Sequence, residues 1–286
     1  MSQNINRKVD IIIPVYNAFD DLKKCVESLK SHTDLSIHRI IFINDCSSDE
    51  KILPYLHEQS DKNIILINNE KNKGFSANVN IGIEYSNQDV ILLNTDTIVT
   101  HQWIEKLSRC AYRQESIATV TPLSNNATLC SVPLFCEENE IPEGVSVDEY
   151  AREIERISLK RYPIIPVAVG FCMYIKRKVI EEVGLFDAKT FGRGYGEEND
   201  FCNRAIQLGF CHVMCDDTFV YHKGSESFLE KEKKEYMLQN DKILRKRYPY
   251  IMKEVLDVYL RQMPNWEINA NAKLFTKVSF SNKKKN

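Results

Sequence analysis

The first third of this chain alternates short, apolar, β-branched segments with segments of helical periodicity. The apolar segments are residues 9–15, 39–43, 63–67 and 89–93, and helical spacing recurs at residues 20–30, 48–58 and 74–85. Segments as continuously apolar as these are typical of strands that are covered on both faces. Strand and helix in regular alternation predict an α/β fold, with a doubly wound, mostly parallel central sheet and helices on both faces. Such sheets bind ligands at the carboxyl ends of their strands.

The rest of the chain is less regular. Helices are expected at residues 101–114, 176–183 and 197–208, and strands at residues 117–121, 167–175 and 219–221. The polar stretch at residues 124–147 is long for a connection inside a compact domain, which predicts a lid or a binding loop. From residue 228 onward the pattern is that of charged amphipathic helices, ending in a lysine tail. We therefore expect one α/β domain, residues 1–226, and a C-terminal helical extension, residues 227–286.

Composition narrows the class of protein. Of the 286 residues, 43% are hydrophobic, and 38 basic against 40 acidic residues give a formal net charge of −2. This balance argues against a disordered chain and against nucleic acid as a partner. The N-terminal segment is polar, and the longest uncharged apolar stretch, residues 164–175, is shorter than the ~20 residues that span a bilayer. These features predict a cytoplasmic protein.

The cysteines are nine in number, and most of them lie in apolar periodic segments, as reduced thiols in a core do. Cys211, His212, Cys215 and His222 are residue types that bind zinc. However, the chain contains no C-x-x-C pair, and neighbouring residues of a strand point to opposite faces. We predict no disulfide framework and no zinc site.

Candidate ligand-binding residues lie at the carboxyl end of each of the four expected strands of the first third or follow it. They are Pro14, Tyr16 and Asn17 for the first strand, Asp45 for the second, Lys73, Gly74 and Asn78 for the third, and Asn94, Thr95 and Asp96 for the fourth. An acid at a strand end can accept hydrogen bonds from a ribose or a base, and a helix N-terminus beside a lysine attracts anions. Ordinary βα turns are the alternative for each group alone. For Ser48 and Asp49 we expect helix capping.

The pair Asn94 and Asp96 flanks one residue at a strand end. Strand alternation would aim both side-chain oxygens the same way, which suits a hard divalent cation that also takes diphosphate oxygens. An Asx-capped turn is an equally good interpretation of the pair. His222, after a short strand, would join such a site only if it had a partner such as Asp96.

Four acidic or amide residues, Glu197 to Asp200, open an expected helix. A helical projection places Glu198 with the apolar face, where partial burial would raise its pKa toward that of a general base. Asp200 and Arg204 are spaced as an i, i+4 surface pair, and Glu197 is explained by the helix dipole.

Taken together, six segments resemble the family 2 glycosyltransferases, inverting sugar transferases with the GT-A fold. They are IIIPVYN from Ile11, FINDCSSD from Phe42, NKGFSANVNIG from Asn72, LLNTDT from Leu92, FGRGYGEENDFCNRA from Phe191 and YHKGSESF from Tyr221. Each is weak alone, but the six occur in the family's order. The resemblance covers residues 9–228 and implies a nucleotide-binding half, about residues 1–100, and an acceptor-binding half with the catalytic base, about residues 101–226.

The resemblance also implies roles for single residues. Tyr16 and Asp45 match positions that hold the base and ribose of the donor. Asp96 matches the second acid of the DxD motif, which binds Mg²⁺ or Mn²⁺ with the diphosphate, and His222 matches a further metal ligand of some members. Glu198 matches the catalytic base, which is usually Asp in the family.

Two departures from the family pattern are visible. Asn94 replaces the first acid of DxD, and Glu198 is one methylene longer than the usual base. The Q-x-x-R-W motif of processive synthases is absent, which implies transfer of a single sugar. Acceptor contacts are expected from Asn125, Asn126, Tyr195 and Glu197.

The implied partners are a UDP-, dTDP- or GDP-sugar and a saccharide or lipid-linked saccharide of bacterial surface polysaccharides, with rhamnosyl- and galactofuranosyltransferases as the subgroup. The basic C-terminal helices suit peripheral contact with the inner face of the plasma membrane, a homodimer contact or a solvated surface. The alternatives are a sugar-1-phosphate nucleotidyltransferase and a non-catalytic nucleotide-sugar-binding protein.

Overall fold

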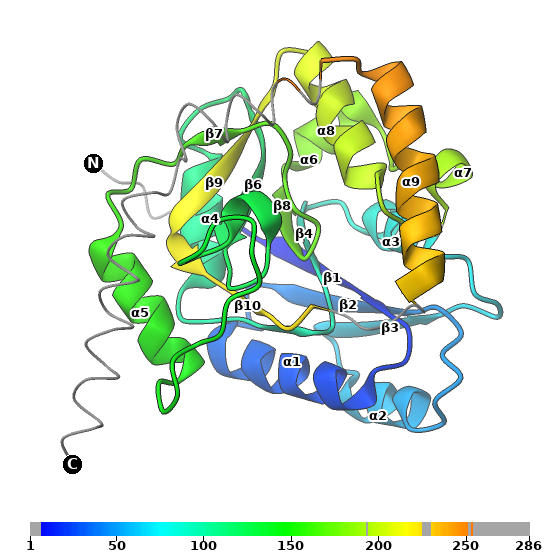
Figure 1. Cartoon of the computed structure of the whole chain (residues 1–286). Coiled ribbons are helices and arrows are strands. Elements are labelled where there is room, and N and C mark those ends of the chain that lie inside the picture. The colour runs from blue at the N-terminus through cyan, green and yellow to red at the C-terminus, as the bar shows by residue number, and fades with distance from the viewer. Residues whose placement is uncertain (1–6, 193, 225–229, 251–252, 254–286) are drawn as a thin grey trace.

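The computed structural model describes residues 7–192, 194–224, 230–250 and 253 (Figure 1). Its strands are β1 (Val9–Val15), β2 (Arg39–Asn44), β3 (Ile64–Asn68), β4 (Asp89–Leu93), β5 (Thr97–Ile98), β6 (Ile117–Leu123), β7 (Ile164–Ile165), β8 (Cys172–Ile175), β9 (Cys211–Phe219) and β10 (Tyr221–His222). Its helices are α1 (Phe19–His32), α2 (Ile52–Gln59), α3 (Phe75–Tyr85), α4 (Trp103–Ala111), α5 (Val147–Ile157), α6 (Arg177–Val183), α7 (Ala188–Phe191), α8 (Glu197–Gln207) and α9 (Glu230–Arg247), with a 3₁₀ turn η1 (Thr128–Cys130).

Eight strands form the central sheet, in the order β3-β2-β1-β4-β8-β6-β9-β7. Strands β1 to β4 pair in parallel, and β6 pairs in parallel with β9. Strand β8 lies between β4 and β6 and runs antiparallel to both, as β7 does to β9. The expected α/β fold with a mostly parallel, doubly wound sheet is confirmed, and β5 and β10 form a separate two-stranded ribbon.

Two apolar layers cover the sheet because successive residues of each strand point to opposite faces. On β1, Ile11 and Ile13 belong to the layer that holds α1, α2, α4 and α5, whereas Ile12 belongs to the layer that holds α3, α6 and α8. All three isoleucines are fully buried. The strands are therefore covered on both faces, which explains why their sequences are continuously apolar.

Two local expectations are wrong. Helix α2 begins at Ile52 rather than at Ser48, and its N-cap position is Lys51. The backbone N–H of Ser48 instead donates to Asn17 Oδ1 at 2.9 Å, so this segment is held by the loop after β1. The expected strand at residues 167–175 shortens to β8, because its pairing with β4 begins at Cys172, and the N–H groups of Ala168 and Val169 donate to side chains instead of a neighbouring strand.

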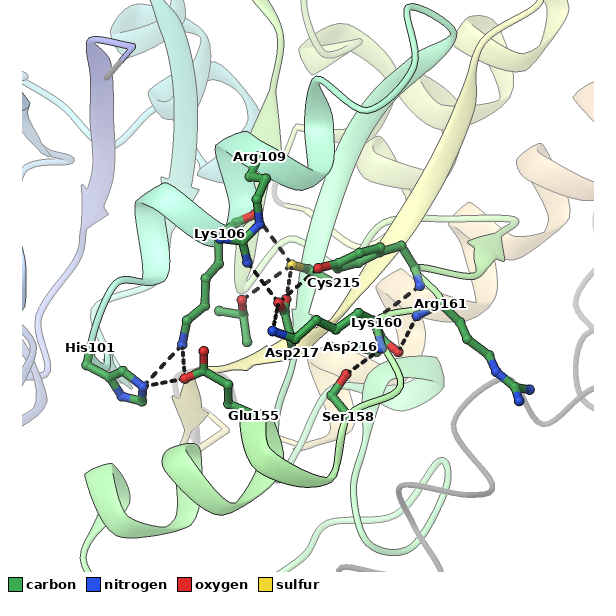
Figure 2. A network of polar contacts seen from close by, with 12 residues as sticks. His101, Lys106, Arg109, Glu155, Ser158, Lys160, Arg161, Cys215, Asp216 and Asp217 are labelled. Carbon is green, nitrogen blue, oxygen red and sulfur yellow. Dashed lines mark hydrogen bonds and ion pairs between the residues drawn. The ribbon is translucent and has the colours of Figure 1, made fainter. Parts of the chain in front are cut away.

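Strand β9 continues the stretch Cys211–Met214, expected as strand, as far as Phe219 and buries two carboxylates that have hydrogen-bond partners (Figure 2). Asp217 accepts hydrogen bonds from Arg109 Nη2 and from the Tyr162 hydroxyl, each at 2.9 Å. Asp216 accepts from the backbone N–H groups of Arg161 and Tyr162. The strand bulges here, since Cys215 pairs with Pro122 but Phe219 pairs with Leu123. These contacts hold the segment before β7 against β9.

Helix α5 was not expected from the sequence. It ends the polar stretch at residues 124–147 and starts with a capping box, in which Ser146 Oγ accepts from the Glu149 backbone N–H and the Glu149 carboxylate accepts from the Ser146 N–H. Within the part of the chain that the structure describes, no helix combines the length and apolar character needed to cross a membrane.

Candidate active site

The β5–β10 ribbon brings together two residues that are far apart in the sequence, Asp96 and His222. His222 pairs with Thr97 across the ribbon, and the Lys223 backbone N–H donates to the Asp96 carbonyl at 3.0 Å. As a result His222 Nε2 lies 3.4 Å from Asp96 Oδ2. The partner that the sequence required for His222 is therefore present, next to the carboxyl end of β4.

The geometry of His222 fits a metal ligand. Its Nδ1 lies 2.6 Å from the Asn126 carbonyl, so Nδ1–H donates there, and Nε2, the nitrogen left for a cation, faces Asp96. A hydrogen bond of this kind, from the ring nitrogen that does not bind the metal, orients most metal-binding histidines. Asp96 Oδ2 is buried and has no hydrogen-bond partner in the described structure. The pair fits two ligands of a divalent cation whose other ligands are diphosphate oxygens and water.

No group of three or more His, Cys, Asp or Glu side chains with the spacing of a metal site occurs among the described residues. A cation here would thus depend on the substrate for much of its coordination. Burial lowers the pKa of His222, but the Asp96 carboxylate and the Asn126 carbonyl raise it more, so its net pKa is above the ordinary value.

Gly170 and Phe171 connect this pair to Glu198. The Phe171 ring stacks on His222 with centroids 5.0 Å apart, and the Phe171 carbonyl accepts from the Asn94 N–H at 2.9 Å. A β-carbon at Gly170 would overlap the Glu198 carboxylate, with Glu198 Cδ 3.0 Å away. Two adjacent residues thus join Glu198 to the Asp96–His222 pair, since Gly170 lies against Glu198 and Phe171 against His222. In the sequence, the signal for this contact is the glycine inside an apolar stretch, because such a glycine often marks a close approach of the backbone to another group.

The two glutamates at the start of α8 differ from the expectation. Glu197 is buried, with 2% of its surface exposed, whereas Glu198 is partly exposed. Loop residue Gly194 lies near the Glu197 carboxylate and closes over the first turn, which is why the helical projection failed there. Burial raises the pKa of Glu197 well above its usual range, and the Glu198 charge raises it further.

Burial also raises the pKa of Glu198, whereas hydrogen bonds from its own backbone, from Glu197 and from the Gly196 backbone lower it. We infer that the two carboxyl groups share one proton. It resides on Glu197, which donates a hydrogen bond to an ionised Glu198. An ionised, partly exposed carboxylate with a raised pKa has the properties of a general base.

The carboxyl ends of β2 and β3 form the second part of the site. Asp45 is buried and accepts from the backbone N–H groups of Lys73 and Gly74 at 2.8 and 2.9 Å. Asn78 donates to the Ile43 carbonyl and accepts from Asn69, which also donates to Asp45. Asp45 and Asn78 thus hold the loop that opens α3, and the Lys73 side chain is exposed at its edge.

Tyr16 and Asn17 follow β1 beside this loop. Tyr16 is 44% exposed, which leaves an aromatic face available. Asn17 has a left-handed backbone (φ 57°), and its Oδ1 accepts from the N–H groups of Ser48 and Asp49. Pro14 lies inside β1 and precedes them. Asn17 therefore joins the loops after β1 and β2.

Residues Asn94 to Asp96 do not continue β4. They form a turn between β4 and β5, so strand alternation does not orient them as the sequence suggested. The Asn94 carbonyl accepts from the Thr97 hydroxyl at 2.7 Å, which tightens this turn. Thr95 is partly exposed within it.

Asn125 and Asn126 lie against His222. Asn125 Oδ1 accepts from the His222 N–H at 2.8 Å, and its Nδ2 donates to the His222 carbonyl at 2.9 Å. Asn125 is buried, while Asn126 is partly exposed. On the other side of the site, Tyr195 has φ 67° and is half-buried next to Glu197. The residues expected to contact an acceptor thus lie on both sides of the Asp96–His222 pair and Glu198.

Asp200 is not the surface residue that its spacing suggested. Only 1% of it is exposed, and besides Arg204 it contacts Arg247 and Tyr248 from the C-terminal part of the chain. Sequence spacing cannot reveal this, because the partners lie more than 40 residues away.

Comparisons with known proteins show the family and the fold of the chain. The family model "Glycosyl transferase family 2" matches residues 10–184. The chain is 28% identical over 182 residues to a protein named "Uncharacterized glycosyltransferase YwdF" from Bacillus subtilis (strain 168). That match covers 63% of this chain and 62% of the relative, so the chain spans about three fifths of the relative's length.

Two solved structures have a similar fold. One is GalNAc-T7 with UDP, GalNAc and Mn²⁺, with a TM-score of 0.63 and 16% identity, covering 88% of this chain and 58% of that chain. The other is the mannosyltransferase PcManGT from Pyrobaculum calidifontis with GDP-Man and Mn²⁺, with a TM-score of 0.62 and 13% identity, covering 95% of this chain and 75% of that chain. Likeness at these identities concerns the fold.

Proposed function

The chain belongs to glycosyl transferase family 2 and has the GT-A fold, and from this premise we propose that it transfers one sugar from a nucleoside diphosphate sugar to an acceptor hydroxyl, with inversion. The observation that carries the proposal is the contact of Glu198 with Gly170, whose neighbour Phe171 stacks on His222 of the Asp96–His222 pair. A direct displacement requires two parts, a base for the acceptor hydroxyl and a site for the departing diphosphate.

The donor occupies the carboxyl ends of β1 to β4 in this proposal. The exposed face of Tyr16 stacks on the base, and the loop that Asp45 holds at Lys73 and Gly74 lies along the ribose and phosphates. Both solved neighbours are complexes with a nucleotide or nucleotide sugar and Mn²⁺. A rhamnose or galactofuranose donor is the narrower proposal.

Asp96 and His222 would hold Mg²⁺ or Mn²⁺, with Asn94 in support. Such an ion supplies positive charge against the departing nucleoside diphosphate. Glu198 removes the proton of the acceptor hydroxyl, whose oxygen then forms the bond to the anomeric carbon as the bond to the diphosphate breaks. In this proposal the protonated Glu197 donates a hydrogen bond to Glu198, which favours the ionised form of Glu198.

The acceptor enters between the segment around Asn125 and Asn126 and the loop of Tyr195 and Glu197. A saccharide or lipid-linked saccharide of a bacterial surface polysaccharide is the proposed class. We assign donor binding to about residues 1–100 and the acceptor and base to about residues 101–226. Residues 227–286 remain the proposed C-terminal extension, a cytoplasmic segment suited to peripheral membrane contact or to a homodimer. Of that extension, the described part is α9 and a few residues after it.

The test is donor hydrolysis by the purified chain without acceptor. UDP-, dTDP- and GDP-sugars, including dTDP-rhamnose and UDP-galactofuranose, are screened by thermal shift with and without Mn²⁺, since a ligand of the folded state raises its stability. The stabilising donor is then incubated with the chain. Slow release of nucleoside diphosphate supports the transferase. Pyrophosphate formation from sugar-1-phosphate and nucleoside triphosphate would identify a nucleotidyltransferase, and binding without turnover a nucleotide-sugar-binding protein.

A further inference from the structure

Helix α9 belongs to the segment that the sequence separates from the catalytic domain, yet it lies beside α7 and α8 (Figure 1). Leu244 is 7% exposed, and its Cδ1 would be 3.3 Å from a β-carbon at Gly196. Gly196 is the N-cap residue of α8. The helix therefore packs on the residue directly before the two glutamates.

Arg247, at the end of α9, makes three polar contacts with the elements around the site. Its Nη1 donates to Asp200 Oδ1 at 2.7 Å and to Asp187 Oδ2 at 2.9 Å, and its Nη2 donates to the Thr190 hydroxyl at 3.0 Å. The Tyr248 hydroxyl donates to the same oxygen of Asp200 at 2.8 Å. Because Asp200 is buried, these donors satisfy a carboxylate that would otherwise be costly to bury.

Asp200 also connects α9 to the segment before α7. Its Oδ2 accepts from Arg204 Nε at 2.8 Å, and the other two nitrogens of Arg204 donate to the carbonyls of Val183 and Leu185. One guanidinium from α9 and one from α8 thus meet at one carboxylate. Asp200 lies two residues after Glu198, in the first turn of α8.

Asn240 holds the loop between α7 and α8. It is 7% exposed, and its Nδ2 donates to the Gly194 carbonyl at 2.9 Å. Gly194, Tyr195 and Gly196 all have positive φ, a conformation that is unfavourable for Tyr195 in particular. Such a backbone persists only where its surroundings fix it, and Asn240 and Leu244 provide that fixation.

We propose that α9 is a positioning element of the active site, in which Arg247 and Asn240 fix the first turn of α8 and its preceding loop so that Glu198 meets the acceptor hydroxyl. The inference rests on the proposed function for its catalytic consequence. None of these α9 residues touches the reacting atoms, so they act through Asp200 and Gly194. A displaced base costs turnover more than donor affinity, since Glu198 acts on the acceptor proton, whereas other residues, Tyr16, the Asp45 loop and the Asp96–His222 pair, hold the donor in this proposal.

The test compares two arginines of the same helix turn. Arg247→Ala removes the contacts to Asp200 and Asp187, whereas Arg245→Ala removes an exposed ion pair with Asp241 at 2.6 Å. We expect Arg247→Ala to lower kcat by about 10- to 100-fold with donor KM little changed, and Arg245→Ala to retain wild-type kcat. Arg247→Lys, which retains the charge but not the forked geometry, should restore part of the loss.

Asn240→Asp serves as a second variant in case Arg247→Ala does not fold. It keeps the side-chain volume but deletes the donor to the Gly194 carbonyl, and we expect the same loss of kcat without a change in donor KM. Equal kcat for the Arg245 and Arg247 variants, or a KM that rises as much as kcat falls, overturns the proposal.

Hydrogen exchange separates this inference from the proposed function. In Arg247→Ala the amides of residues 194–200 should exchange faster while those of β1, β2 and β4 keep their protection. Unchanged exchange at residues 194–200 overturns the positioning role. A wild-type chain that hydrolyses no donor refutes the proposed function, but the exchange comparison still decides whether α9 orders this turn.

Discussion

The α-carbon of Gly170 lies directly against the carboxylate of Glu198. A β-carbon at residue 170 would overlap Glu198 Oε1 and lie 3.0 and 3.1 Å from Cδ and Cγ. The neighbouring Phe171 stacks on His222, which faces Asp96. The segment before β8 thus sets the distance between the base and the metal-binding pair.

Gly170→Ala should therefore displace Glu198 and lower kcat strongly, by about 100-fold if the carboxylate moves by about 1 Å. Glu198→Asp in the same chain shortens the side chain and relieves the overlap. We expect the double variant to be more active than Gly170→Ala alone, as measured by steady-state donor hydrolysis. A double variant that is less active would show that the two residues are not coupled in this way.

Glu198→Gln should lower kcat by about 10² to 10⁴-fold, because the amide cannot accept the acceptor proton. The donor dissociation constant, measured by calorimetry, should change little. Glu197→Gln should retain most activity, since Glu197 already holds its proton, and Glu181→Gln on the exposed face of α6 is the control. Near-normal turnover in Glu198→Gln would refute the base assignment.

The pH profile of turnover should report the Glu197–Glu198 pair. The base works when ionised, so kcat falls as the pH decreases through the pKa of Glu198, which burial raises above its ordinary value. Glu197→Ala removes a hydrogen bond that lowers this pKa, and the acidic limb of kcat against pH should move to higher pH. An unchanged limb in Glu197→Ala would contradict proton sharing within the pair.

His222→Ala should weaken Mn²⁺ binding. The variant loses Nε2, which faces Asp96 at 3.4 Å, and we expect the Mn²⁺ concentration for half-maximal turnover to rise by at least about 10-fold. In the presence of EDTA, wild type and variant should show the same thermal stability increase with nucleoside diphosphate. Equal Mn²⁺ dependence in both would remove His222 from the metal site.

His212 should make the fold sensitive to acid. It is fully buried, with Nδ1 2.7 Å from the Thr119 hydroxyl and Nε2 3.0 Å from the Cys202 carbonyl. Burial lowers its pKa to about 4 from an ordinary value near 6.5. The neutral form therefore stabilises the fold above pH 6.5, and up to about 3 kcal/mol is lost as the pH falls from 6.5 to 4.

Urea unfolding at pH 7.5 and pH 5 measures this loss. In His212→Gln the free energy of unfolding should change less between the two pH values than in wild type. Exposed His57 on α2 gives the matched control, and His57→Gln should keep the wild-type dependence. A wild-type stability that is the same at both pH values would contradict the buried neutral state.

The sequence predicted the sheet because strands that are buried on both faces must be continuously apolar. Such apolar segments can be recognised in the sequence without knowing which strands they pair with. It also placed the polar residues of the site at the strand ends, since the carboxyl ends of parallel strands meet at one edge. The local pattern failed where the prediction depended on a single helix turn. Ser48 does not cap α2, because Asn17 from another loop accepts the hydrogen bond of the Ser48 N–H.

The order of the two glutamates could not be read from helical periodicity. Glu197 is buried next to Gly194, which belongs to the loop before α8 and not to the helix. Asp200 likewise looked like half of a surface pair until α9 brought Arg247 to it. Helical periodicity indicates which face of a helix is turned toward the core. It does not show which other segments pack on the first turn of the helix.

By itself, the sequence determined the α/β class, the four-strand parallel core and the residue types that gather at its edge, because side-chain burial and strand alternation are local properties. The tertiary structure decided which of those residues meet. Asp96 reaches His222 through the β5–β10 ribbon, and Glu198 reaches both through Gly170 and Phe171. Contacts between residues so distant in the chain depend on strand pairing and close packing, which no local pattern contains.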